Sequence, residues 1–594
     1  MNQKKIIFPL IAVVAVFIFS CWRMAELPLW GHYPLFLFLS GWFSVILLFA
    51  IFRKRNIVYW KNLALVSVSS ILLLLSFPPI SWTPLIFLSF IPILYYLDSG
   101  LKKQKTSWFL IYHSFVLWNI LCTWWVANTA LIPGIVAIWL NSLFMLIPVW
   151  LSIKTSNYFP KLAWWPLVFY WVAYEQLHHQ WEMSWPWLSL GNAWSGFSSW
   201  VQWYEYTGTF GGSFWTLVIN LLIYNFIKKY FELKNQNFGQ WIRDKKFHLS
   251  MILVSIFIPV ATSFFIKSKV QDSNLKVKVA IVQPNFEPHY QKFEVSESDQ
   301  FDRFDSLSRA IVDRETRYLI FPETSFGEAG AVLRSNILAR DPRIEQWKKF
   351  LDSFPKLALV TGVTSIHELA LHENPTKFSR KFSRTDPPRY FEVENAAIQI
   401  TSSNEDIPHY RKSRLVPGAE LFPYRKWLPF LKPLVDKLGG SIEGLATQKD
   451  REVFTNENYK IAPVICYESI YGDYMRGYAL NGAQAIFVMT NDGWWDDTPG
   501  YLQHREFARL RAIEFRKPVM RSANTGSSCF INSKGEISQA TAYGVPAVIS
   551  QEVHFSDQLT FFAKYGDLIG RICKYVSFLF IVVMLIFRIS KSKN

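Results

Sequence analysis

Three short polar segments in the second half of the chain carry residue types that enzymes use for acid–base and nucleophilic chemistry. Glu323 directly follows the apolar run Leu-Ile-Phe-Pro, so its carboxylate would lie at the carboxyl edge of a sheet, where α/β enzymes place their sites. Lys412 and Glu420 flank a Pro-Gly turn. Cys466 ends an apolar run and begins a helix-like segment. A thiol on such a corner would face the amide groups of a helix N-terminus, which stabilise a thiolate.

Each segment alone has a simpler interpretation. Glu323 could be a solvent-facing residue at a strand end, the segment that carries Lys412 could be an ordinary surface loop, and Cys466 could pack in a core. Together the three segments are much more specific than any one of them, and they make this region the candidate active site.

The elements that must position these side chains read as alternating strands and helices. Residues 276–284 alternate and then become apolar, which is typical of a strand. Further strand-like runs lie at 318–321, 357–363, 395–401, 461–466 and 485–490, and helix-like stretches lie at 301–314 and 503–516. Strands that alternate with helices indicate an α/β domain.

The remainder of the chain is far more apolar. The sequence is 51% hydrophobic and 17% aromatic, and these residues concentrate in 1–270 and 575–588. About 20 apolar residues cross the hydrocarbon core of a bilayer. We expect ten membrane spans, of which the fourth is short: 6–22, 33–52, 57–77, 84–97, 108–126, 131–153, 162–178, 211–227, 249–266 and 575–588.

The basic residues provide a test of that count. Membrane proteins concentrate Lys and Arg in their cytoplasmic loops. The basic clusters at 4–5, 53–55, 102–105, 228–246 and 588–593 all fall on the cytoplasmic side if every run crosses the membrane. The segment between the ninth and tenth spans, about 267–574, is then outside the cytoplasmic membrane.

Charge and cysteine usage exclude two other classes of protein. Residues 1–270 hold 20 Lys and Arg against 7 Asp and Glu, which leaves 42 and 38 for the remainder. The net charge of +17 therefore belongs mainly to the loops of the membrane half, and does not indicate nucleic-acid binding. The five cysteines show no paired spacing, so neither a disulfide framework nor a zinc site is indicated.

The three polar segments resemble the catalytic Glu, Lys and Cys motifs of the nitrilase (carbon–nitrogen hydrolase) superfamily, in that superfamily's order. With membrane helices on both sides, the chain resembles the apolipoprotein N-acyltransferase family. The likeness rests on Phe-Pro-Glu-Thr around Glu323, on Lys412 followed eight residues later by Glu420, and on Ile-Cys-Tyr-Glu around Cys466. It continues through 491–495, 503–514, 521–526 and 565–567, and in the membrane half through 185–192. One departure is Gly418-Ala419, where the family usually has Phe-Gly.

The resemblance implies a fold and a domain organisation. We expect a multi-span α-helical membrane domain and an external α/β nitrilase-like domain, an α-β-β-α sandwich. Residues 1–56 would be two additional transmembrane helices, 57–270 a seven-helix membrane domain, 271–567 the periplasmic catalytic domain, and 568–594 a transmembrane helix with a cytoplasmic tail. The implied location is the inner membrane of a bacterium.

The resemblance also implies roles for the site residues. Cys466 would take an acyl group from a phospholipid as a thioester and pass it to the α-amine of a diacylglyceryl-modified lipoprotein. Glu323 would accept protons, and Lys412 would favour the thiolate and stabilise the oxyanion. Glu420 would position Lys412 or assist proton transfer, while Tyr467 and Glu468 would shape the site. No metal or organic cofactor is implied; the partners are the two lipid substrates and the bilayer.

Two other functions remain open at this stage. A membrane-tethered amidohydrolase could use the same Glu-Lys-Cys triad with water as acceptor. A transporter with an accessory outer domain is disfavoured because few ionisable residues lie deep in the expected spans. Aromatic side chains at the membrane surface would suit lipid substrates, and we expect five tryptophans to form such a belt: Trp185, Trp187, Trp194, Trp200 and Trp203.

Overall fold

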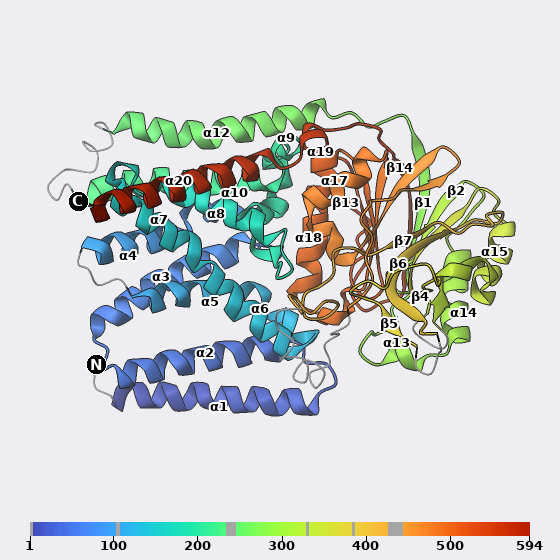
Figure 1. Cartoon of the computed structure of the whole chain (residues 1–594), viewed down its shortest axis with the longest axis horizontal. Helices are drawn as coiled ribbons and strands as arrows, with labels where there is room; N and C mark the ends of the chain where they lie inside the picture. The colour runs from blue at the N-terminus through green and yellow to red at the C-terminus, as the bar shows by residue number, and fades with distance from the viewer. Residues whose placement is uncertain are drawn as a thin grey trace. The chain divides into compact units, whose positions relative to one another are not determined.

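The computed structural model describes residues 4–102, 107–232, 245–327, 332–382, 387–425 and 444–593. The chain divides into two compact units (Figure 1). The helical unit comprises Met1–Lys267 together with Asp567–Asn594, and the α/β unit comprises Ser268–Gly566.

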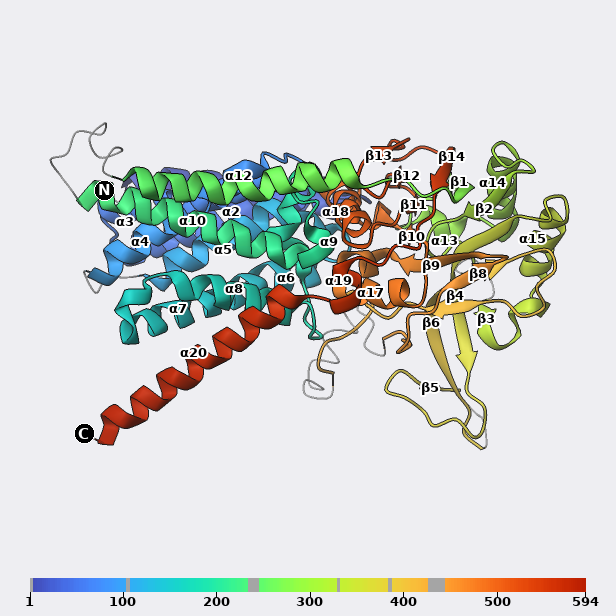
Figure 2. The same cartoon turned by 90° about the horizontal axis from the view of Figure 1, so that it is seen from above.

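The helical unit is built from apolar helices joined by short turns. Its main helices are α1 (Lys4–Glu26), α2 (Tyr33–Phe52), α3 (Ile57–Ser76), α4 (Ile91–Lys102), α5 (Trp108–Thr123), α6 (Leu131–Phe144), α7 (Leu146–Tyr158), α8 (Trp165–His178), α10 (Thr209–Glu232), α12 (Lys246–Lys269) and α20 (Leu568–Lys593). The last helix returns to pack against α8 and α10, and Figure 2 shows it running at an angle to α7.

Among the described residues, eight helical segments are long and apolar enough to cross a membrane. They correspond to eight of the ten expected spans. The expected spans at 84–97 and 162–178 form shorter helices: an apolar segment at Thr83–Ser99 and α8, which has 14 residues. Both fall below the length of about 20 residues that a perpendicular crossing needs, so the count of ten spans stays a prediction.

Large apolar side chains are exposed along several of these helices. Phe8 on α1 is 78% exposed, Phe257 on α12 is 71% exposed and Phe578 on α20 is 65% exposed. Such extended apolar surface is unfavourable in water and suits contact with lipid acyl chains.

The expected tryptophan belt is wrong. Trp187 and Trp194 are almost completely buried, and Trp185 and Trp203 are also buried. The rings pack inside the helical unit, with the centroids of Trp194 and Trp215 lying 4.6 Å apart. Four of the five tryptophans therefore form core and Trp200 is half-buried, with the 3₁₀ segment Leu190–Trp200 packed against α10.

The α/β unit contains two sheets. In the first sheet the order is β14 (Ala547–His554), β1 (Lys276–Gln283), β2 (Thr316–Ile320), β4 (Ala358–Glu368), β6 (Tyr390–Ile400) and β5 (Arg380–Lys381), with β3 (Leu333–Arg334) paired to β4 and β7 (His409–Arg411) paired to β6. In the second sheet the order is β13 (Ile537–Ser538), β12 (Cys529–Ile531), β11 (Val519–Ala523), β10 (Ala485–Thr490), β9 (Tyr459–Ile465) and β8 (Phe454–Asn456).

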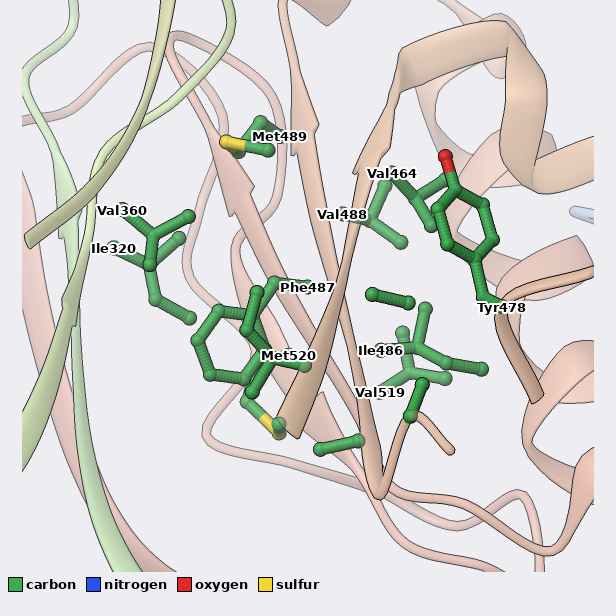
Figure 3. Packing of buried hydrophobic residues seen from close by; sticks show 14 of the residues in the cluster. Ile320, Val360, Val464, Tyr478, Ile486, Phe487, Val488, Met489, Val519 and Met520 are labelled. Atoms are coloured by element: carbon green, nitrogen blue, oxygen red, sulfur yellow. The ribbon is translucent and has the colours of Figure 1, made fainter. Parts of the chain in front are cut away.

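The core of this unit lies between the two sheets and on both outer faces. Successive side chains of a strand point to opposite faces. Figure 3 shows Phe487 and Met489 of β10 pointing toward Ile320 and Val360 of the first sheet, while Ile486 and Val488 point the other way. Strands that are apolar on both faces, such as β10, are typical of a sheet that is covered on both sides.

Helices cover the outer faces and complete an α-β-β-α sandwich. Helices α14 (Glu297–Arg309) and α15 (Pro342–Asp352) pack on the first sheet through Phe304 and Trp347. Helices α17 (Gly472–Leu480) and α18 (Pro499–Phe515) pack on the second sheet. The expected fold class is confirmed. Each of the six strand-like runs and both helix-like stretches falls on an observed strand or helix.

Candidate active site

Cys466 lies on a strained corner at the end of β9. The strand ends at Ile465 and a short 3₁₀ helix, Cys466–Ile470, begins at the cysteine itself. Its φ angle of 47° is in the left-handed region, which costs a non-glycine residue about 1–3 kcal/mol. A nucleophile held on a tight strand-to-helix turn projects its side chain beyond the sheet edge. Cys466 is 7% exposed, so the thiol lies in a nearly closed site.

Glu323 belongs to the first sheet and contributes to the same site as Cys466. It follows β2 by three residues, and the next residue, Thr324, has a φ of 50°. Strand β4 passes so close that a Cβ atom at Gly362 would lie 2.6 Å from the Glu323 Cα, which explains the glycine at that position. The Glu323 Oε2 accepts a hydrogen bond of 3.1 Å from the backbone N–H of Asn491, which follows β10 of the second sheet.

Lys412 lies between two carboxylates. It directly follows β7, and its Nζ donates to Glu323 Oε1 at 2.9 Å and to Glu420 Oε1 at 2.7 Å. Asn395 of β6 donates from Nδ2 to the same two carboxylates, at 2.8 Å and 3.3 Å. The Gly418-Ala419 pair keeps Glu420 in place, because Gly418 takes the left-handed conformation and Glu420 Oε2 accepts from the Val416 N–H at 2.8 Å.

Burial and these contacts set the charges of the ion pair. Burial opposes ionisation of Glu323, but the adjacent Lys412 ammonium holds the pKa of that carboxyl below its usual range. Burial likewise opposes protonation of Lys412, yet the carboxylates of Glu323 and Glu420 raise its pKa well above the usual value. The pair is therefore charged at neutral pH.

The thiol itself is protonated at rest. Burial raises the pKa of Cys466, and the negative charge of Glu323 raises it further, while Lys412 acts in the opposite direction. We expected Lys412 and a helix N-terminus to favour the thiolate. The effect of Lys412 has the expected sign, but burial and Glu323 outweigh it, so formation of the thiolate requires transfer of its proton to a base.

Glu468 ties the nucleophile segment to the lysine segment. Its Oε2 accepts from the Ile465 N–H at 2.9 Å, and its Oε1 accepts from the Ser413 N–H at 2.7 Å and from the Tyr410 hydroxyl at 2.9 Å. Burial raises the pKa of this carboxyl. Glu468 thus connects the residue before Cys466 with the residue after Lys412.

Tyr467 is buried beside the nucleophile, and its ring packs against Tyr471 with centroids 5.2 Å apart. We expected Tyr467 and Glu468 to shape the site, and both lie beside the nucleophile, where such a role is possible.

Three contributors to the site escaped the sequence analysis. Asn395 lies inside a strand, Lys292 is buried and donates to the Thr324 hydroxyl, and Thr490 lowers the pKa of the Cys466 thiol. Asn395 in a strand-like run could have indicated a site residue, because Asn is depleted in strands. Within the described residues, no group of three or more His, Cys, Asp or Glu side chains could hold a metal ion.

The two sheets, with a buried Cys, Glu and Lys where their edges meet, define a carbon–nitrogen hydrolase domain, and the model of that family matches residues 278–557. A second family model, the apolipoprotein N-acyltransferase N-terminal domain, matches residues 69–222 of the helical unit. The chain is therefore similar to the apolipoprotein N-acyltransferase family in both of its units, and is an acyltransferase with a multi-pass membrane domain.

Relatives match over most of their length. The chain is 27% identical to an apolipoprotein N-acyltransferase of Chlorobaculum tepidum over 85% of this chain and 93% of the relative. It is 24% identical to that of Geobacter metallireducens over 85% of this chain and 92% of the relative. Among solved structures, Saccharomyces cerevisiae Nit3, of branch 10 of the nitrilase superfamily, matches with 16% identity and a TM-score of 0.33, over 48% of this chain and 92% of that chain.

Proposed function

We propose that this enzyme transfers a fatty acyl group from a membrane phospholipid, through a thioester on Cys466, to the α-amino group of the S-diacylglyceryl-cysteine at the N-terminus of an apolipoprotein. One observation carries the chemistry. Lys412 is fixed between Glu323 and Glu420 in the same buried space as the Cys466 thiol. The acceptor follows from the relatives, which are named apolipoprotein N-acyltransferases.

In the first half-reaction, Glu323 accepts the Cys466 proton as the sulfur attacks the ester carbonyl of the phospholipid. Lys412, held by its two carboxylate partners, stabilises the negative oxygen of the tetrahedral intermediate. The carbon–oxygen bond of the ester then breaks. The departing glycerol oxygen takes the proton from Glu323, which leaves a lysophospholipid and an acyl thioester on Cys466.

In the second half-reaction, the α-amine of the lipoprotein attacks the thioester carbonyl, and Glu323 takes a proton from that amine. The carbon–sulfur bond breaks, and the Cys466 thiolate leaves and is reprotonated by Glu323. The products are an N-acylated lipoprotein and the free enzyme. Glu420 remains bonded to Lys412 in both steps and keeps the ammonium group aimed at the oxyanion.

A thioester test separates acyl transfer from hydrolysis. Purified enzyme mixed with phospholipid alone should gain one acyl chain on Cys466, visible by intact mass and removed by neutral hydroxylamine. A diacylglyceryl-cysteine peptide should then discharge it as an N-acyl product with ping-pong kinetics. Cys466→Ala should form no adduct, whereas Cys529→Ala should form it normally, because Cys529 is buried in β12. Rapid loss to free fatty acid with no N-acyl peptide would establish the amidohydrolase alternative instead.

We also propose that the α/β unit lies on the periplasmic side of the inner membrane, from the distribution of basic residues. Leu371, on an exposed loop of that unit, is 83% exposed, and Lys54 at the end of α2 is exposed. In spheroplasts of a Cys21→Ser background, an impermeant maleimide should label Leu371→Cys at once. It should label Lys54→Cys only after the membrane is opened. The reverse pattern would place the unit in the cytoplasm.

A further inference from the structure

A buried polar network, which takes no part in the reaction above, holds the backbone carbonyl of Cys466 at its strained corner. The carbonyl oxygen of Cys466 accepts from the Ser469 hydroxyl at 2.8 Å and lies 3.2 Å from Nε2 of His504. His504 comes from α18 and is completely buried. Nε2 also lies 2.9 Å from the Ser469 hydroxyl oxygen. Because the carbonyl can only accept and the Ser469 proton is already donated to it, a proton on Nε2 satisfies both of these contacts.

The far side of the His504 ring is held by an ion pair. Nδ1 lies 3.0 Å from Arg521 Nη2 and 3.1 Å from Asp492 Oδ1. In the tautomer with its proton on Nε2, Nδ1 accepts from the guanidinium group, which only donates, whereas the contact with Asp492 Oδ1 calls for a proton on Nδ1. Arg521 Nη2 and Asp492 Oδ2 are themselves 2.6 Å apart, and both side chains are fully buried.

The electrostatics agree with this arrangement. Burial lowers the pKa of His504, so the ring is neutral in the folded protein. Burial acts against ionisation of Asp492, but Arg521 and His504 lower the pKa of that carboxyl to about 2, so it stays charged.

The same carboxylate also acts on the thiol of Cys466. Asp492 Oδ1 accepts from the Thr490 hydroxyl at 2.9 Å, and Asp492 and Thr490 shift the pKa of the Cys466 thiol in opposite directions. The ion pair is therefore linked through His504 to the carbonyl of the nucleophile and influences its side chain electrostatically. Because the peptide unit is planar, holding the carbonyl also fixes the plane of the bond between Cys466 and Tyr467.

We propose that His504, oriented by the Asp492–Arg521 ion pair, is a positioning residue that holds Cys466 in its left-handed conformation and aims the thiol at the acyl donor. The expected effect on the acylation rate rests on the proposed function, whereas the expected effect on the backbone of Cys466 does not. A residue that acts by alignment affects the chemical step, since a misplacement of about 1 Å costs on the order of 10²-fold in rate.

The test compares His504→Leu, which removes the donor, with His504→Gln, whose amide N–H can donate to the same carbonyl. Tyr318→Phe is the matched control. It removes a buried side-chain donor to the Tyr459 carbonyl, at the opposite end of β9 from Cys466. Full-length enzyme is used throughout, and the thermal midpoint is measured for each variant.

His504→Leu should slow single-turnover acylation of Cys466 by on the order of 10²-fold with little change in KM, and His504→Gln should recover most of that loss. Backbone amides of residues 467–470 should exchange with deuterium faster in His504→Leu than in Tyr318→Phe at a similar thermal midpoint. The exchange measurement needs no acyl substrate, so it decides the positioning role even if the proposed acyl transfer fails. Unchanged exchange in His504→Leu, or acylation as fast as in Tyr318→Phe, would overturn the proposal.

Discussion

Two buried glutamates, Glu323 and Glu468, belong to the site, and their surroundings drive their pKa values apart. Glu323 receives hydrogen bonds from an ammonium group, an amide side chain and a backbone N–H, and its pKa is lowered because Lys412 outweighs burial. Glu468 receives hydrogen bonds from two backbone N–H groups and from tyrosine hydroxyls, and burial raises its pKa. The same residue type is thus charged in one place, which suits the proton acceptor proposed above, and braces two backbone segments in the other.

The largest expected effect separates these two carboxylates by activity. Glu323→Gln should lower kcat by about 10³–10⁴-fold, because the proton of Cys466 then has no base to accept it. Glu468→Gln should lower kcat by about 10²-fold, because the amide only displaces the segments that carry Cys466 and Lys412. Steady-state N-acylation of a lipopeptide measures both. Equal losses would show that the opposed surroundings do not correspond to different roles.

The sequence predicts several residues of the site. Glu323 and Cys466 each follow an apolar run, and α/β domains place their sites at the carboxyl ends of such strands. Lys412 is identified instead from its Pro-Gly turn and from the resemblance to the family motif. Glu420 is eight residues from Lys412 across one turn, so its proximity follows from local geometry.

The remaining site residues depend on long-range packing. Asn395 lies beside Lys412 because β6 pairs with β7 in a register that places Ala396 opposite Arg411, and the Lys412 N–H donates to the Asn395 carbonyl at 2.8 Å. His504 reaches Cys466 only because α18 packs on the second sheet. The net pKa of the thiol depends on burial, which no single segment specifies. The length of α8 and the burial of the tryptophans near residue 190 likewise follow from helix packing, not from hydropathy.

A smaller effect concerns the charged groups that shift the pKa of the Cys466 thiol. Three charged groups influence Cys466: Glu323 and Asp492, which raise its pKa, and Lys412, which lowers it. A thiolate is destabilised by a nearby anion and stabilised by a nearby cation. The pH midpoint for alkylation of Cys466 by iodoacetamide, followed by peptide mass spectrometry, should therefore fall in Glu323→Gln and rise in Lys412→Met, by about one unit or more in each case.

This pH measurement distinguishes a general base from a residue that merely promotes ionisation. Glu323→Gln should make the thiol easier to ionise while abolishing turnover, and only the loss of a proton acceptor explains both results. Glu468→Gln provides the comparison, since Glu468 is not among the main groups that shift the thiol pKa, and its midpoint should stay near that of the wild type. A rise of the midpoint in Glu323→Gln would contradict the assignment of Glu323.

The smallest expected effects come from removing one neutral donor from each carboxylate. Tyr410→Phe removes a hydrogen bond of 2.9 Å to Glu468, and Asn395→Ala removes one of 2.8 Å to Glu323. A hydrogen bond to a charged or buried acceptor contributes about 1–3 kcal/mol, so the thermal midpoint of each variant should fall by a few degrees.

Activity should separate the two variants. Asn395→Ala frees both Glu323 and Glu420 to move and should lower kcat about 10-fold, whereas Tyr410→Phe leaves Glu468 bonded to both backbone N–H groups and should keep kcat within about 3-fold. Similar thermal midpoints with different kcat values would mean that Glu323 is positioned for chemistry and Glu468 for structure. A loss of activity in Tyr410→Phe as large as in Asn395→Ala would instead show that Glu468 is part of the catalytic geometry.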